Sequence, residues 1–169
     1  MPRKFVESRK EMEKLLIEER LGYLGMSVDN KPYVIPMTYG YVGGRIIFHC
    51  EVKGRKLDIL RNNANVCFTV SRYFGEMVSH PQGAECHINS DSVICYGRAR
   101  IIDDLEERCE VLNVFNRCLQ PGAREIVLAE VQHCLAVEIV VDEMTGRTER
   151  DGKRKYWKQT APNLVNQKN

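Results

Sequence analysis

The sequence predicts a mainly β fold, an antiparallel barrel of six strands with helices on its outside. Six short segments of strand composition occur along the 169 residues, and three of them follow one another through tight turns. Helical patterns separate the others, but without the regular β-α-β alternation of a doubly wound parallel sheet. The length fits a single domain over residues 1–169, with a basic tail from about residue 151.

The N-terminal segment is predicted to form a helix and a hairpin. Ser8 to Arg20 carries apolar residues at helical spacing, and Ser8 followed three residues later by Glu11 is typical of a capping box. The alternating segment Gly22 to Val28 and the segment Pro32 to Tyr41 are the first two strands, joined by a tight turn.

The middle of the chain is predicted to hold two strands, a helix and a long loop. Arg45 to Cys50 is the third strand, and a helix over roughly Gly54 to Asn62 follows it. Asn65 to Arg72, rich in β-formers, is the fourth strand. Tyr73 to Ser90 lacks a regular period and is expected to be a loop, of a length that is usually functional or mobile.

The C-terminal half is predicted to contain the last two strands and two helices. Asp91 to Asp103 is the fifth strand, and the amphipathic helix Leu105 to Leu119 begins after two aspartates that suit an N-cap. A short helix near Ala123 to Gln132 and a sixth strand, Leu135 to Met144, follow. The next two residues, Thr-Gly, are expected to turn the chain.

Composition argues against several classes of protein. A formal charge of +2 and a pI of about 8.1 do not favour a nucleic-acid partner. Seven cysteines without a CxxC pair fit neither a secreted disulfide framework nor a zinc site with paired ligands. Because no signal-peptide core and no apolar run of about 18 residues is found, we expect a cytoplasmic protein without a membrane span.

Three cations cluster around one glycine where the second predicted helix begins: Lys53, Gly54, Arg55 and Lys56. A helix N-terminus has unpaired N–H groups and roughly half a positive charge, so cations there are unfavourable unless an anion is nearby. An arginine can grip two phosphate oxygens, and a lysine acts as a movable charge. The pattern suits a phosphate monoester, whereas composition alone favours a solvated basic turn.

Two further residues near this turn have alternative interpretations. His49 ends the third strand, four residues before the cations, and either contacts a bound ligand or bonds a backbone carbonyl. Pro36 cannot donate to a ladder, so it marks an edge, a bulge or a place where something other than a strand pairs.

The long predicted loop contains His80, Cys86 and His87, which could bind a soft metal or present a reactive thiol. No fourth ligand has a standard spacing, so a structural role is favoured and no metal site is predicted. The basic tail is poor in apolar residues apart from Trp157, which we expect to anchor the tail or to cover a ligand rather than to pack in the core.

Two stretches together resemble a known superfamily. They are GYLGMSVDNKPYVIPMTYGYVGGRIIFHCEVKGRKLDILRNNANVCFTVS and SVICYGRARIIDDLEE, in this order and spacing. They are similar to the pyridoxamine 5'-phosphate oxidase-like FMN-binding split-barrel superfamily, and within it to the nitroimidazole-resistance (Nim-like) flavoproteins. The resemblance implies a homodimer of six-stranded split barrels with FMN bound at the subunit interface.

The same resemblance assigns site residues. It implies that Gly54, Arg55 and Lys56 hold the FMN phosphate, and that the backbone of Val34 to Thr38 lines the edge of the isoalloxazine ring. The partner chain would contribute from near Ser92 and Val93, and a histidine in the position of His49 lies close to the flavin. The predicted cofactor-binding residues are Val34, Pro36, Met37, Thr38, His49, Lys53, Gly54, Arg55, Lys56, Ser92, Val93 and Trp157, with His49 as the candidate catalytic residue.

The expected function is an FMN-dependent oxidoreductase that reduces a small electron-poor substrate such as a nitro-aromatic, with the flavin carrying the electrons. The alternative is a non-catalytic protein that binds or stores flavin or heme, with heme the less favoured cofactor. A pyridoxamine-phosphate oxidase is a weaker alternative, because the tail RKYWKQTAP lacks the histidine of that enzyme's C-terminal arginine-and-histidine element.

Overall fold

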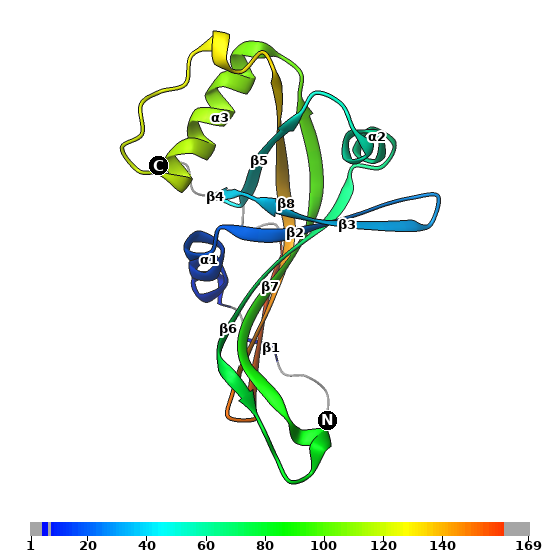
Figure 1. Ribbon diagram of the computed structural model, residues 1–169, viewed down its shortest axis with the longest axis vertical. Coiled ribbons are helices and arrows are strands. Elements are labelled where there is room, and N and C mark those ends of the chain that lie inside the picture. Colours follow the sequence, from blue (N-terminus) through cyan, green and yellow to red (C-terminus); the bar gives the residue numbers. More distant parts are fainter. Residues whose placement is uncertain (1–4, 7, 161–169) are drawn as a thin grey trace.

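The computed structural model describes residues 5–6 and 8–160, so the end of the predicted tail lies outside the described residues. Within them, nine strands form one sheet, and three α-helices pack beside it (Figure 1). The elements are β1 (Phe5–Val6), α1 (Arg9–Glu18), β2 (Leu21–Val28), β3 (Lys31–Thr38), β4 (Gly40–Val42), β5 (Arg45–Glu51), α2 (Arg55–Asn62), β6 (Asn65–Val78), η1 (Gly83–Glu85), β7 (His87–Ile102), α3 (Leu105–Leu119), η2 (Leu128–Glu130), β8 (Cys134–Arg150) and β9 (Lys153–Thr160).

The strands pair in the order β3-β2-β6-β7-β8, and β8 then pairs with both β5 and β9. Every pair is antiparallel except β1 with β9. The first half of β8 pairs with β5, which also pairs with β4, and its second half pairs with β9. Only Tyr39 lies between β3 and β4 in the sequence. These two strands do not pair with each other, so the sheet does not close into a complete barrel.

This arrangement is consistent with a split barrel and corrects the predicted count of six strands. The predicted second strand is divided at Tyr39 into β3 and β4, which pair with different neighbours. Tyr39 is buried, and its hydroxyl donates to the carbonyl of Leu16 in α1 at 2.9 Å. The hydroxyl of Tyr41 donates to Glu13 of the same helix at 2.7 Å, so both tyrosines hold α1 against the sheet.

The core has two parts on opposite faces of β5. Phe48 points into the main cluster, together with side chains such as Leu24 and Phe68. Ile47 points the other way and packs with Phe115 of α3. This alternation is the period of two that a strand buried on both faces requires.

Three of the four predicted helices are confirmed as α1, α2 and α3, with one correction. Asp104 caps α3 by accepting the N–H of Glu107 at 2.8 Å. Ser8 is the N-cap residue of α1, but its side chain makes no capping hydrogen bond, so the predicted capping box is wrong.

The predicted loop from Tyr73 to Ser90 is wrong. Strands β6 and β7 continue through most of it and form a long hairpin, green at the bottom of Figure 1. Nearly every β6 side chain beyond Arg72 is exposed, so this part of the strand has no buried face to impose an alternating pattern.

Two C-terminal predictions also fail. The segment from 123 to 132 contains only the short 3-10 turn Leu128–Glu130. Strand β8 continues through Thr145 and Gly146, and the turn comes at Asp151 and Gly152, both with positive φ. Gly146 instead allows Met12 to pack closely against β8, since a Cβ at this position would lie 2.9 Å from Met12 Cγ. In the part of the chain that the structure describes, no helix is long and apolar enough to cross a membrane.

Candidate functional site

Gly54 is the N-cap residue of α2, in a conformation that glycine alone adopts easily. Its φ is +134°, and its carbonyl accepts the N–H groups of Leu57 at 2.9 Å and Asp58 at 3.3 Å. A Cβ at this position would meet nothing within 4 Å, so backbone conformation rather than crowding requires the glycine. The backbone at the start of α2 therefore faces open space.

The cations beside Gly54 form no ion pair with any described residue, and Glu51 is the carboxylate that lines a cavity with them. Arg55 lies over the ring of Tyr33, with its guanidinium carbon 4.6 Å from the ring centroid. The amine of Lys56 is 3.6 Å from the sulfur of Met37 and 5.7 Å from the centroid of the Phe48 ring. Within the described residues, the side chains of Arg55, Lys56 and Lys53 form no ion pair, whereas most arginines elsewhere do.

A cavity of about 470 Å³ opens in front of this turn, and we call it the α2 cavity. It brings together five predicted residues with two half-buried side chains of β3, Tyr33 and Ile35. It also includes His133, which sequence reasoning missed. The ladder between β5 and β8 pairs Glu51 with Cys134 and so brings His133 to the cavity, a long-range contact without a local signal. The predicted residues that line the α2 cavity are His49, Lys53, Gly54, Arg55 and Lys56.

His49 lies on the face of β5 that packs against α3, and its side chain is exposed there. Its ring meets the edge of the Phe115 ring, with centroids 5.4 Å apart and planes at 64°. Among the described residues its imidazole makes no hydrogen bond to a backbone carbonyl, so the strand-capping alternative finds no support. Its presence in the α2 cavity leaves it available to a ligand.

Strand β3 is an edge strand, which confirms one of the interpretations of Pro36. Its ladder within the described residues is with β2 alone, where Pro36 faces Tyr23. Val34, Pro36 and Thr38 are exposed, while Met37 points toward α2 and contacts Lys56. None of the predicted β3 residues lines the α2 cavity, whereas Tyr33 and Ile35 of the same strand do.

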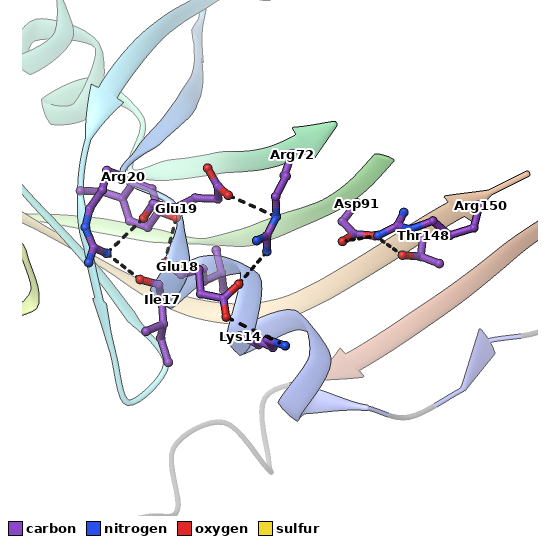
Figure 2. Close-up of polar contacts among 11 residues, drawn as sticks. Lys14, Ile17, Glu18, Glu19, Arg20, Arg72, Asp91, Thr148 and Arg150 are labelled. Atoms are coloured by element: carbon purple, nitrogen blue, oxygen red, sulfur yellow. Dashed lines mark hydrogen bonds and ion pairs between the residues drawn. The ribbon is translucent and has the colours of Figure 1, made fainter. Parts of the chain in front are cut away.

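The remaining predicted residues, Ser92, Val93 and Trp157, lie in a different place. They line a second cavity of about 890 Å³ between α1, the β6–β7 hairpin and the β8–β9 pair, which we call the α1–β9 cavity. It shares no lining residue with the α2 cavity. Figure 2 shows part of its polar wall, where Arg72 bridges two glutamates of the α1 end and Arg150 meets Asp91.

Trp157 does not belong to a loose tail. It lies in β9 opposite Gly146, is half-buried, and packs against the main core cluster. The expectation that it would not pack in the core was therefore wrong, because the pairing of β9 with β8 brings its ring against Gly146, which has no side chain to exclude it.

His80, Cys86 and His87 have structural contacts at the tip of the hairpin. Nδ1 of His80 accepts the N–H of Gln82 at 3.1 Å, and Nε2 of His87 accepts the N–H of Gly152 at 3.1 Å. The sulfur of Cys86 accepts the N–H of His80 at 3.4 Å. These contacts support the favoured structural role, and the described residues contain no group of three or more potential ligands that could hold a metal ion.

Comparison with known proteins finds a protein family whose model matches this chain. A family model described as pyridoxamine 5'-phosphate oxidase matches residues 8–148. An uncharacterized protein of Rhizobium meliloti (strain 1021) is 28% identical over 155 residues, which cover 84% of this chain and 93% of that protein.

Several solved structures share the fold, among them the following two. A candidate 5-nitroimidazole antibiotic resistance protein from Bacteroides thetaiotaomicron is 26% identical with a TM-score of 0.71, covering 83% of this chain and 84% of that one. A FAD and heme binding protein from Mycobacterium smegmatis is 19% identical with a TM-score of 0.76, covering 95% of this chain and 78% of that one. At this lower identity the likeness concerns the fold alone.

Proposed function

The chain belongs to the pyridoxamine 5'-phosphate oxidase family, and from this premise we propose that it is a flavoprotein that holds the phosphate of FMN at the N-terminus of α2. The observation that carries the proposal is the set of three cations around Gly54 that have no ion pair in the described part of the chain.

The residues present fit a phosphate monoester. The fork of Arg55 and the amine of Lys56 would each form charge-assisted hydrogen bonds to phosphate oxygens. The first N–H groups of α2 have no partner within the helix, and Gly54 exposes this backbone to the cavity. Lys53 adds a third charge at the same cavity. An anion bound here would relieve the unfavourable interaction of these cations with the helix dipole.

The free edge of β3 is the proposed seat of the flavin ring. Because β3 pairs with β2 alone among the described strands, a planar ring can approach its other edge. Pro36 removes one N–H from an edge that another strand would otherwise extend. His49 would contact the cofactor from the other side of the α2 cavity.

We place a second copy of the chain in the functional protein. Ser92, Val93 and Trp157 line a cavity separate from the α2 cavity, which suits two half-sites completed by a homodimer. In this arrangement the partner would contribute those three residues to each FMN.

The proposed reaction class is reduction of a small electron-poor substrate such as a nitro-aromatic. Its support is the 26% identity with the candidate 5-nitroimidazole resistance protein over most of both chains. Bound flavin supplies the electron or hydride transfer. The residues of this chain would hold the phosphate and orient the ring against β3.

An absorbance spectrum of the purified protein tests the cofactor, and a redox cycle tests the activity. Flavin bands, or their appearance on adding FMN, support the proposal. A Soret band would favour a heme protein instead, and a colourless protein that takes up no FMN would refute the site. Bleaching of the flavin by NAD(P)H and its reoxidation by a nitro-aromatic separate an enzyme from a cofactor-binding protein.

A further inference from the structure

The chain has four histidines, and two of them line the α2 cavity with their imidazoles unbonded. His80 and His87 each accept a backbone N–H at the tip of the β6–β7 hairpin. The imidazoles of His49 and His133, in contrast, form no hydrogen bond or ion pair with any described residue. His49 already has a role in the proposed site, whereas His133 has none.

The backbone on both sides of His133 is held in place. Nη1 of Arg108 in α3 donates to the carbonyl of Val131 at 3.3 Å and to the carbonyl of Cys134 at 3.1 Å. The side chain of Val131 is buried in the core cluster beneath α3, and the β5–β8 ladder pairs Cys134 with Glu51. His133 therefore projects an exposed side chain from a fixed backbone.

Arg108 uses all of its hydrogen bonds for backbone carbonyls. Its side chain is buried, Nε donates to the carbonyl of Ile102 at 3.1 Å, and Nη2 donates to that of Asp103 at 2.7 Å. It pairs with no carboxylate among the described residues, although buried charges usually have such a partner. These four bonds join the end of β7 and the start of α3 to the segment that carries His133.

The groups that line the α2 cavity with His133 leave it positively charged. The three cations of the turn at Gly54 and one carboxylate, Glu51, sum to two positive charges while the histidines are neutral. A phosphate monoester carries about two negative charges above its second pKa, near pH ~6. Burial raises the pKa of both thiols in the cavity, which therefore stay neutral. The titratable groups beside these charges are the imidazole of His49, the phenol of Tyr33 and the thiols of Cys50 and Cys134.

From the unbonded imidazole, its fixed backbone and its place in a cationic cavity, we infer that His133 is a further phosphate-contact residue. Its ring N–H donates a hydrogen bond to a phosphate oxygen, and the ring takes up a proton from solvent when the phosphate binds. Opposite charge favours the protonated form of an imidazole, so this contact strengthens as the pH falls toward about 6.5. The identity of the ligand as FMN rests on the proposed function, whereas the contact with a phosphate monoester does not.

Titration of the His133→Gln variant with FMN and with riboflavin at two pH values tests this contact. Glutamine keeps an N–H donor but cannot take up a proton. The variant should bind FMN roughly fivefold to tenfold more weakly than the wild type at pH ~6.5, and at most about twofold more weakly at pH ~8.5, where the imidazole is neutral. Its affinity for riboflavin, which lacks the phosphate, should stay the same at both.

A matched variant and the shape of the loss separate contact from structure. His80→Gln is the control, because His80 lies at the tip of the β6–β7 hairpin and does not line the α2 cavity. It should bind FMN as the wild type does. An unchanged FMN affinity in His133→Gln, an equal loss at both pH values, or an equal loss for riboflavin would overturn the inference, and so would the same loss in the His80 control. Because His133 is exposed, its replacement leaves the core intact.

Phenyl phosphate, a monoester without a flavin, distinguishes failure of this inference from failure of the proposed function. In an NMR titration of the flavin-free protein, the imidazole C–H signal that is absent from His133→Gln should move with phenyl phosphate and not with chloride at equal ionic strength, while the His80 signal stays in place. A protein that binds no FMN but shows this response refutes the proposed function and leaves the contact standing. A protein that binds FMN without any response of His133 refutes the inference alone.

Discussion

The guanidinium group of Arg55 lies over the ring of Tyr33, 4.6 Å from its centroid. This contact joins the first residue of α2 to the edge strand β3, and so links the proposed phosphate grip to the proposed seat of the flavin ring. Lys56 makes the same connection through the sulfur of Met37. The two cations are thus oriented by β3 while their charges remain free for a ligand.

Replacing Arg55 and Lys56 together with alanine should weaken FMN binding by a few kcal/mol, because charge-assisted hydrogen bonds contribute about 1.5–3 kcal/mol each. Titration of flavin fluorescence measures the loss. Arg61→Ala is the matched control, since Arg61 is an exposed cation in the last turn of the same helix and does not line the α2 cavity. An unchanged FMN affinity in the double variant would remove the phosphate assignment.

Tyr33→Leu should weaken FMN binding by about 0.5–1 kcal/mol, the usual size of an exposed cation–π contact, because Arg55 loses the ring that orients it. Tyr33→Phe keeps the ring and should bind FMN as the wild type does. If both variants lose equal affinity, the hydroxyl rather than the stacked ring is responsible, and the orienting role is refuted.

Gly54→Ala should destabilise the protein by about 1–3 kcal/mol, because an L-residue is strained at a φ of +134° even though the Cβ has room. Chemical denaturation measures the change. Gly83→Ala serves as the comparison, since a Cβ at Gly83 also meets nothing within 4 Å and no positive φ is required there. Equal stability of the two variants would contradict the account of the helix start.

The folded protein should lose stability above about pH 10. Burial raises the pKa of Tyr39 and of Tyr41 well above the usual value for tyrosine, and the hydrogen bond to Glu13 raises that of Tyr41 further. An unfolded tyrosine ionises near pH ~10. The contribution of these two hydroxyl groups to stability is therefore fully present below that pH and falls as the pH rises, because only the unfolded chain readily releases their protons. Tyr39→Phe should flatten the decline, and an identical alkaline profile in that variant would show that other groups cause it.

Local signals in the sequence were enough to predict the start of the site but not its surroundings. The strand β5, the cationic turn and α2 follow one another in the chain, so their periodicity and the three cations around Gly54 are readable directly. The far half of β6 and the whole of β9 escaped prediction because their side chains are mostly exposed and no buried face imposes an alternation.

The pairing of distant segments could not be predicted either. His133 reaches the α2 cavity only through the β5–β8 ladder, and the helix expected just before it does not form. Gly146 was interpreted as a turn, yet it lies within β8 because Met12 and Trp157 pack against it. In both cases a tertiary contact, rather than the local sequence, decides the structure.

Comparing FMN with riboflavin, which lacks only the phosphate, tests the central claim most directly. In a side-by-side equilibrium titration the wild-type protein should prefer FMN by at least about a hundredfold, the combined effect of two charge-assisted hydrogen bonds. The Arg55→Ala/Lys56→Ala variant should lose most of that preference while its affinity for riboflavin stays the same. Equal affinity of the wild-type protein for FMN and riboflavin would contradict the assignment of the α2 N-terminus as the phosphate site.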